Sequence, residues 1–304
     1  MYRYHVAISK GRAESELAAA EDPLADDRAH LKHPFKIERE TGMNRRLANG
    51  TVNASQSGDG PPLVLLHSLL SDRASFDRIA PELSKSFRVI VPELPGFGES
   101  QAVSGGLAAV ADRMAGAIDD CADGEDVIVL GNGYGGFVTL QMAIRHPNIA
   151  RKLILADCGA AFSEAGRAAF RNMAAASRAK GLSAITDIAM GRLFAPKFQA
   201  ANPDLMRDRR EAFLRTDPEV FRAACDALAK LDLRPQLGQV KVPVLVVVGE
   251  HDEATPPPMS HEIAASLPQA RLKIIPGCAH VPQLQAPAAF LAAIGDFLSP
   301  AAVR

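Results

Sequence analysis

The sequence predicts an α/β protein in which a mostly parallel central sheet is flanked by helices. Short apolar runs rich in Val, Ile and Leu recur along the chain, and helical stretches separate them. Such runs suit strands that are buried on both faces of a parallel sheet, and the alternation with helices is typical of a doubly wound sheet. The length of 304 residues fits one large domain with an insertion.

The apolar runs and the stretches between them give the expected elements in order. Strands are expected at 63–67, 87–91, 126–130, 152–156, 244–248 and, more weakly, 271–275. Helices are expected at 73–84, 107–121, 135–145, 259–265 and 288–297. Upstream of these, Asn49-Gly50 is a hairpin signal, although the flanking strands would be short and polar.

One interval lacks strand-like runs and is expected to be an inserted helical cap, residues 159–237. Helical segments follow one another there, at 163–180, 182–194, 204–215 and 218–231. Asp217-Pro218 indicates a helix start, with Asp at the N-cap and Pro in the first turn. The expected organisation is a poorly ordered N-terminal extension (1–42), a core formed by 43–158 and 238–304, and the cap.

Composition and charge exclude several classes of protein. A hydrophobic content of 47% and a net charge of −1 exclude a disordered chain and a nucleic-acid binder driven by bulk positive charge. No apolar run approaches the roughly 20 residues that a membrane helix needs, and residues 1–10 lack the apolar segment of a signal peptide. The four cysteines are scattered and show no metal-ligand spacing. We therefore expect a cytoplasmic protein with a small-molecule substrate and no metal, cofactor, nucleic-acid or membrane partner. Homo-oligomerisation stays open.

A glycine-rich run follows one expected strand and opens a helix, and two kinds of site use such a turn. In a nucleophile elbow, G-x-S-x-G, small residues permit a strained corner that exposes a nucleophile. In a dinucleotide fold, G-x-G-x-x-G lets a pyrophosphate approach the backbone. Gly131, Gly133 and Gly136 match the second pattern literally, and Asp157 lies about 20 residues later, where a ribose-binding acid belongs.

Residues elsewhere favour the elbow, because an acid and a histidine end the last two strands in the order that hydrolases use. Asp252 follows the strand at 244–248, and His280 follows the final strand. With these residues the chain resembles the α/β-hydrolase superfamily over about 61–298, cap included. The resemblance implies that His280 is a general base, that Asp252 orients it, and that the backbone amides of Leu69 and Tyr134 form an oxyanion hole.

Within the superfamily the chain resembles 3-oxoadipate enol-lactonases and meta-cleavage-product hydrolases. The similarity lies in His67-Ser68-Leu69 and in segments 181–196, 216–219 and 250–257. It implies hydrolysis of a small carboxylated ester or enol-lactone, with Ser68 contacting the substrate. One or two cap arginines would then face the pocket, but spacing does not show which. The candidates are Arg167, Arg171, Arg207, Arg209, Arg210, Arg215 and Arg222.

Gly133 stands where that family carries Ser, Cys or Asp, and glycine has no side chain to attack a carbonyl. Three explanations stay open. The pair of His280 and Asp252 acts as a general base on water or on an acidic substrate proton. Alternatively, the protein is an inactive ligand- or partner-binding pseudoenzyme, like the N-myc downstream-regulated branch, which also carries glycine there. Thirdly, the glycine is a change confined to this sequence, engineered or otherwise, in an ordinary serine hydrolase. Ser68 is set aside as a substitute nucleophile because its loop lacks the strain and aim of an elbow.

Other chemically active side chains are expected to be structural. Asp157 is the alternative acid for orienting His280, and we expect it to support the fold instead. His67 is expected to orient its own loop, as it does in the family that the chain resembles. Cys158 and Cys278 are expected to be buried apolar thiols.

Overall fold

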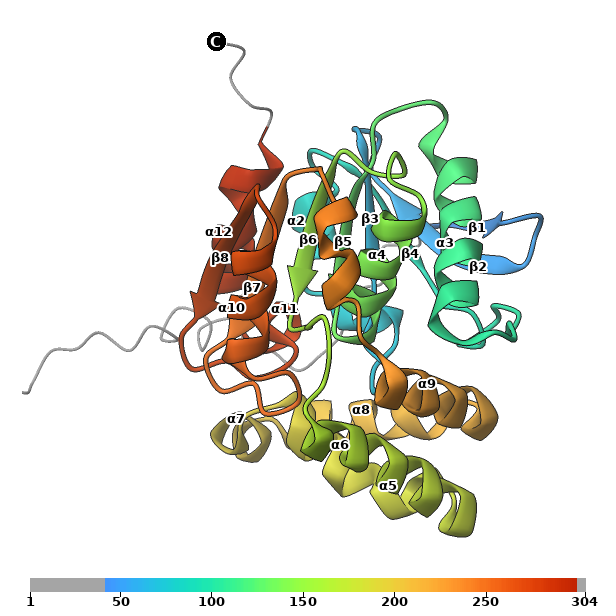
Figure 1. Cartoon of the computed structure of the whole chain (residues 1–304), viewed down its shortest axis with the longest axis vertical. Coiled ribbons are helices and arrows are strands. Elements are labelled where there is room, and N and C mark those ends of the chain that lie inside the picture. The colour runs from blue at the N-terminus through green and yellow to red at the C-terminus, as the bar shows by residue number, and fades with distance from the viewer. Residues whose placement is uncertain (1–41, 300–304) are drawn as a thin grey trace, which may run out of the picture.

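A computed structural model describes residues 42–299, and its centre is an eight-stranded sheet (Figure 1). The strand order is β1-β2-β4-β3-β5-β6-β7-β8; β1 pairs with β2 and β2 with β4 antiparallel, and all the other pairs are parallel. The strands are β1 (Met43–Leu47), β2 (Val52–Ser57), β3 (Pro62–Leu66), β4 (Arg88–Pro92), β5 (Ile128–Asn132), β6 (Lys152–Ala156), β7 (Val244–Gly249) and β8 (Ala270–Ile275). Apart from Gly42, the expected N-terminal extension lies outside the described residues.

Helices cover both faces of the sheet because the strand side chains alternate between two apolar cores. Val64 and Leu66 of β3 face the core that contains α3 and α4, whereas Leu63 and Leu65 face the core that contains α12. The helices outside the cap are α2 (Ala80–Leu83), α3 (Gly106–Ala122), α4 (Tyr134–Arg145), α10 (Pro257–Ser266), α11 (Pro282–Gln285) and α12 (Pro287–Leu298). Within the described residues, no helix has the length and hydropathy that crossing a membrane requires.

The chain between β6 and β7 is helical and gathers at one end of the sheet (Figure 1). Its elements are α5 (Glu164–Lys180), α6 (Thr186–Leu193), α7 (Pro196–Ala201), α8 (Pro203–Leu214) and α9 (Pro218–Lys230), with short 3₁₀ turns at Leu182–Ile185 and Arg234–Gln239. Asp217 caps α9 by accepting from the Glu219 and Val220 amides. The two connections to the sheet are clasped together, since the Leu233 amide donates to the Ala160 carbonyl at 2.8 Å.

The structure corrects one local expectation and confirms another. The helix expected over 73–84 is wrong as a single element: a 3₁₀ turn at Arg73–Phe76 precedes α2, because Pro81 lacks an amide hydrogen and fits only the first turn of a helix. The polar segments around Asn49-Gly50 do form a hairpin, β1 and β2. Val52 and Ala54 of β2 are buried, while β1 is a mostly exposed edge strand, so polar residues are tolerated there.

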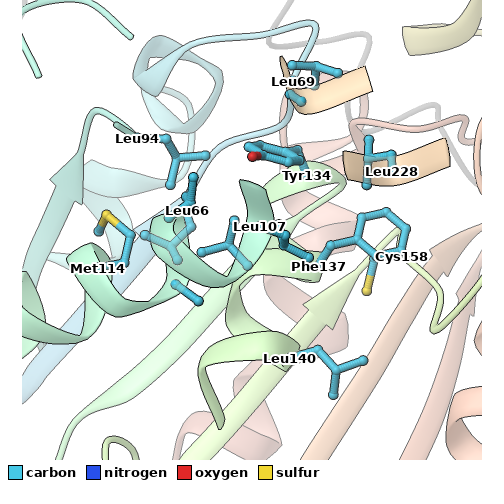
Figure 2. Packing of buried hydrophobic residues seen from close by; sticks show 14 of the residues in the cluster. Leu66, Leu69, Leu94, Leu107, Met114, Tyr134, Phe137, Leu140, Cys158 and Leu228 are labelled. Atoms are coloured by element: carbon cyan, nitrogen blue, oxygen red, sulfur yellow. The ribbon is translucent and has the colours of Figure 1, made fainter. Parts of the chain in front are cut away.

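Helix α4 begins in close backbone contact with the ends of β3 and β5. A Cβ atom on Gly135 would lie 2.2 Å from the Leu66 carbonyl oxygen, and one on Gly131 would lie 2.2 Å from the Gly135 oxygen. The Gly135 amide also donates to the His67 carbonyl at 3.0 Å. Farther along α4, Phe137 and Leu140 pack into the core formed with α3 (Figure 2). Gly131 and Gly135 are therefore explained by helix-strand packing.

The contact at Gly135 makes a stability prediction. Gly135→Ala forces a methyl group against the β3 backbone and is expected to destabilise the protein by about 3 kcal/mol. Gly116→Ala is the matched control: Gly116 lies inside α3 with no atom within 4 Å of its Cβ position, so alanine should stabilise that helix by about 0.5–1 kcal/mol. Urea unfolding followed by circular dichroism measures both, and equal effects of the two substitutions would contradict the packing argument.

Candidate active site

His280 and Asp252 meet beyond the ends of β8 and β7 and form a buried hydrogen-bonded pair. His280 Nδ1 lies 2.9 Å from Asp252 Oδ2, and the two residues are only 5% and 2% exposed. The carboxylate is held in turn, since Asp252 Oδ1 accepts from the amides of Ala254 and Thr255, and Oδ2 accepts from Thr255 Oγ1 at 2.7 Å. The sequence analysis missed Thr255 because it depends on a turn that places residue 255 back over residue 252.

The pKa of Asp252 shows the effect of these partners. Burial alone raises the pKa of this carboxyl, but the charge of His280 and the hydrogen bonds from His280 and Thr255 outweigh burial and lower it below its ordinary value. Asp252 is therefore an ionised acceptor for the Nδ1 hydrogen of His280. In the tautomer that carries this hydrogen on Nδ1 alone, Nε2 can accept a proton.

Asp157 lies beside this pair, and its pKa is shifted in the opposite direction from that of Asp252. Burial, followed by repulsion from Asp252, raises its pKa well above the ordinary value. Its Oδ1 accepts from the Gly249 amide at 2.8 Å, and its backbone adopts a positive φ of 50°. Ligand atoms of Asp157, Asp252 and His280 lie within 4.8 Å of one another. Asp252 and His280 already share a hydrogen bond, and the raised pKa of Asp157 favours its protonated form. The cluster is therefore better suited to proton transfer than to metal binding.

An amide network that sequence reasoning missed supports the same region. Asn132 Nδ2 donates to the His280 carbonyl at 2.9 Å and lies 3.4 Å from Asp157 Oδ2. Gln283 Nε2 donates to Asn132 Oδ1 at 3.0 Å. All of these groups are buried. The sequence could have indicated Asn132 as a site residue, because it stands directly before Gly133 in the glycine-rich run.

Gly133 lies at the turn between β5 and α4, with φ 53° and ψ −116°. A Cβ atom at this position would lie 2.3 Å from Ser68 Oγ and 2.7 Å from His280 Nε2. Ser68 Oγ itself lies 3.4 Å from His280 Nε2. The structure therefore brings Gly133, Ser68 and His280 together, and the serine side chain fills the space beside the glycine.

The loop after β3 is fixed by His67, as the resemblance implied. The Leu94 amide donates to His67 Nε2, so Nδ1 carries the hydrogen and donates to the Ser68 carbonyl at 2.9 Å. Burial lowers the pKa of His67, which keeps the ring neutral. Leu69 on this loop and Tyr134 at the start of α4 both line the pocket. The Tyr134 amide, at the first helical position, has no partner within the helix.

The pocket over these groups is mostly apolar and lies between the sheet and the cap. It encloses about 390 Å³ of space, part of it open to solvent. The larger apolar side chains from α4, α5, α9 and the chain before α5 that line it are Phe137, Phe162, Phe170, Met173 and Leu228. Figure 2 shows Leu228 of the cap close to Tyr134 and Phe137. Such a lining excludes water from an aliphatic or aromatic ligand.

One cap arginine lines this pocket, and it is Arg192 of α6, which the sequence analysis did not single out. The seven arginines proposed from the sequence contact other groups of the protein. Their partners are the carbonyls of Phe162 and Leu231 for Arg167, Glu164 for Arg171, Asp204 for Arg207, Asp72 for Arg209 and Arg215, Asp187 for Arg210, and Glu219 for Arg222. Among residues 42–299, Arg192 shows no ion pair or hydrogen bond to another side chain.

Comparison with known proteins identifies the architecture. A family model described as "Alpha/beta hydrolase family" matches residues 63–293. The chain belongs to the alpha/beta hydrolase family. A pimeloyl-[acyl-carrier protein] methyl ester esterase of Neisseria meningitidis serogroup B is 30% identical over 78% of this chain and 92% of that protein. A 2-hydroxymuconate semialdehyde hydrolase of Pseudomonas sp. is 28% identical over 86% of this chain and 95% of its own length.

Solved structures of hydrolases superpose on the whole described fold. The enol-lactonase from Burkholderia xenovorans LB400 gives a TM-score of 0.78 at 26% identity, and covers 85% of this chain and 100% of that one. A thermophilic esterase from Thermogutta terrifontis gives a TM-score of 0.76 at 28% identity, over 84% of this chain and 98% of that one. The predicted α/β-hydrolase fold is thereby confirmed, and hydrolase chemistry is supported at the level of the family.

The raised pKa of Asp157 predicts a pH-dependent effect of Asp157→Asn. As pH rises above about 4, the unfolded carboxyl ionises while the folded one keeps its proton, so the parent loses stability, at most about 1.4 kcal/mol per pH unit. Asparagine has no proton to lose, accepts the Gly249 amide and tolerates positive φ. Urea unfolding between about pH 4 and pH 8 should show the stability of Asp157→Asn increasing relative to the parent.

The control for this experiment is Asp59→Asn, since Asp59 is exposed on a loop. Its substitution measures how the loss of one exposed carboxyl group changes the free energy of unfolding over the same pH range. A stability difference between Asp157→Asn and the parent that stays constant over the same pH range would contradict the raised pKa of Asp157.

Proposed function

We propose that this protein hydrolyses a small carboxylated ester or enol-lactone, with His280 as general base and Asp252 as its orienting acid. The observation that carries the proposal is the 2.9 Å contact between His280 Nδ1 and Asp252 Oδ2, together with the position of His280 on the wall of an apolar pocket. The similarity to an enol-lactonase and to an esterase supports the same reaction class.

The proposed chemistry begins with proton transfer to His280. Nε2 accepts a proton from the hydroxyl group that attacks the substrate carbonyl, and the ionised Asp252 stabilises the imidazolium that forms. The Leu69 and Tyr134 amides donate to the carbonyl oxygen as it becomes negative. The proton on Nε2 then passes to the leaving oxygen. These reaction steps use only groups of the protein, the substrate and the attacking hydroxyl.

Arg192 supports a carboxylate on the substrate. A guanidinium group binds a carboxylate through a pair of hydrogen bonds, and such a bond is strongest where apolar walls exclude water. Arg192 lines the same pocket as His280, and its guanidinium has no acidic partner among the described residues. We therefore place the reacting carbonyl at His280 and the substrate carboxylate toward α6.

A catalytically inactive binding protein is the second candidate, and Gly133 favours it. Without a nucleophile at the elbow, the same pocket and Arg192 would hold a small carboxylate and release it unchanged. The pair of His280 and Asp252 argues against this candidate, because keeping two ionisable groups buried is costly and a binding protein has no use for it. For either candidate the proposed setting is the cytoplasm, since the four cysteines are buried and their scattered positions in the sequence are typical of thiols in a reducing compartment.

Substitution of the base gives the first test of the proposed function. His280→Ala is expected to lower kcat/KM for p-nitrophenyl esters and for an enol-lactone by about 10²–10⁴-fold, because His280 is the one histidine or carboxylate in the lining of the described pocket that can take the proton. His261→Ala is the matched control, since His261 is exposed on α10 and far from the pocket lining. A parent protein that hydrolyses neither substrate, and binds a small carboxylate with a measurable Kd, would favour the binding protein.

Substitution of Arg192 tests the carboxylate. Arg192→Met keeps an unbranched apolar stem and removes the charged guanidinium group, so the KM for a p-nitrophenyl half-ester of a dicarboxylic acid should rise about 10–100-fold. The KM for a neutral p-nitrophenyl ester should stay within about twofold. Arg178→Met, on the exposed face of α5, should change neither value. Equal effects on the charged and the neutral ester would contradict a carboxylate site at Arg192.

A further inference from the structure

We propose that Ser68 is the nucleophile of this enzyme, in place of a side chain at the elbow. The inference rests on the proposed hydrolytic function and identifies the hydroxyl group that attacks. It differs from the expectation drawn from the sequence, in which Ser68 only contacts the substrate. It also excludes direct attack by water in the first step.

The geometry around His280 carries the proposal. Ser68 Oγ lies 3.4 Å from His280 Nε2, on the opposite side of the ring from Asp252. Ser68 is 2% exposed, so solvent does not compete with His280 for its hydroxyl group. Distances of this length are common between a catalytic nucleophile and its base before substrate binds, and they shorten in the complex. Ser68, His280 and Asp252 thus form a complete relay from hydroxyl to base to acid.

The absence of a side chain at position 133 makes this arrangement sterically feasible. A Cβ atom there would lie 2.3 Å from Ser68 Oγ and 2.9 Å from Ser68 Cβ. Non-bonded carbon and oxygen atoms do not approach so closely, and optimal contacts are about 3.5–4.0 Å. Ser68 could not hold its present rotamer beside a serine, cysteine or aspartate at the elbow. Glycine at 133 and the inward hydroxyl of Ser68 are therefore two parts of one arrangement.

The backbone of the Ser68 loop is fixed as firmly as a nucleophile requires. The Ser68 carbonyl accepts from His67 Nδ1 at 2.9 Å and from the Ser71 amide at 3.3 Å. Next to it, the Gly135 amide donates to the His67 carbonyl and ties the loop to α4. The Leu69 amide directly follows Ser68, just as the Tyr134 amide follows Gly133. An oxyanion formed by attack from Ser68 would therefore meet a donor on the nucleophile's own loop.

The proposed covalent step balances without any further reactant. Ser68 Oγ forms a bond to the substrate carbonyl carbon while its proton moves to His280 Nε2, and the carbonyl π pair moves onto oxygen. The tetrahedral intermediate collapses, the bond to the ester or lactone oxygen breaks, and that oxygen takes the proton from Nε2. Water, deprotonated by His280, then attacks the acyl carbon, and Ser68 Oγ leaves with the proton.

A fluorophosphonate probe tests the assignment independently of substrate choice, because it reacts with an activated serine. The parent should be labelled on tryptic peptide 47–73, and fragmentation of that peptide should place the adduct on Ser68 and not on Ser71. Ser68→Ala should abolish labelling and lower kcat/KM for p-nitrophenyl esters by about 10³-fold or more. Ser71→Ala is the matched control, since Ser71 is a buried serine of the same loop outside the pocket lining, and it should behave like the parent.

The outcomes separate this inference from the proposed function. Hydrolysis that persists in Ser68→Ala but is lost in His280→Ala would overturn Ser68 as nucleophile and leave the hydrolase intact, with water attacking directly. Labelling of Ser68 in a parent that does not hydrolyse the carboxylated esters would support the nucleophile and reject the substrate class. A folded parent that is neither labelled nor active would overturn both.

A position swap gives a second readout. In Ser68→Gly/Gly133→Ser the crowding between the two positions is removed and a hydroxyl is restored at the elbow, so the label should move to position 133. In Gly133→Ser alone, the Ser68 side chain still crowds the new serine side chain at position 133. This variant should therefore be labelled more slowly than the double variant. Faster labelling of Gly133→Ser than of the double variant would contradict the steric link between the two positions.

Discussion

Backbone contact at the first turn of α4 fixes the distances on which the candidate active site depends. Gly131 and Gly135 have no side chains, so α4 approaches β3 and β5 to a separation that a single Cβ atom would prevent. The hydrogen bond from the Gly135 amide to the His67 carbonyl then locks the loop after β3 to the start of the helix. Gly133, Ser68 and the two candidate oxyanion amides consequently occupy one rigid unit.

The charge next to His280 depends on which of two buried carboxyl groups, Asp157 or Asp252, is ionised. Asp252 has His280 and Thr255 as donors, and its pKa is lowered, whereas burial and the nearby Asp252 charge raise the pKa of Asp157. Two adjacent carboxylates could not both remain ionised without water. The raised pKa of Asp157 therefore favours Asp252 as the negative charge beside His280, while the Asn132 amide donates to the His280 carbonyl and the Gln283 amide donates to Asn132 Oδ1.

The sequence predicts the strands, the larger helices and the positions of Asp252 and His280, because buried parallel strands have continuous apolar runs and active-site residues follow strand ends. Pro81 interrupts an apolar pattern that otherwise suggests one helix from 73 to 84, which periodicity alone cannot detect. Arg192 is missed for a different reason: whether a cap arginine meets an acid or the pocket depends on how α6 packs. The orientation of the Ser68 hydroxyl toward His280 likewise depends on the space beside Gly133. Sequence patterns do not show this contact, because the two loops are 65 residues apart.

The clasp between the two connections of the cap has a consequence for how this enzyme can diversify. Strands β6 and β7 are neighbours in the sheet, and the Ala160 carbonyl and the Leu233 amide join the chain just where it leaves and re-enters the core. Everything between these two points can be lengthened, shortened or exchanged without altering a single strand pairing. The pocket wall that the cap contributes is thus a replaceable module, while His280 and Asp252 stay with the sheet.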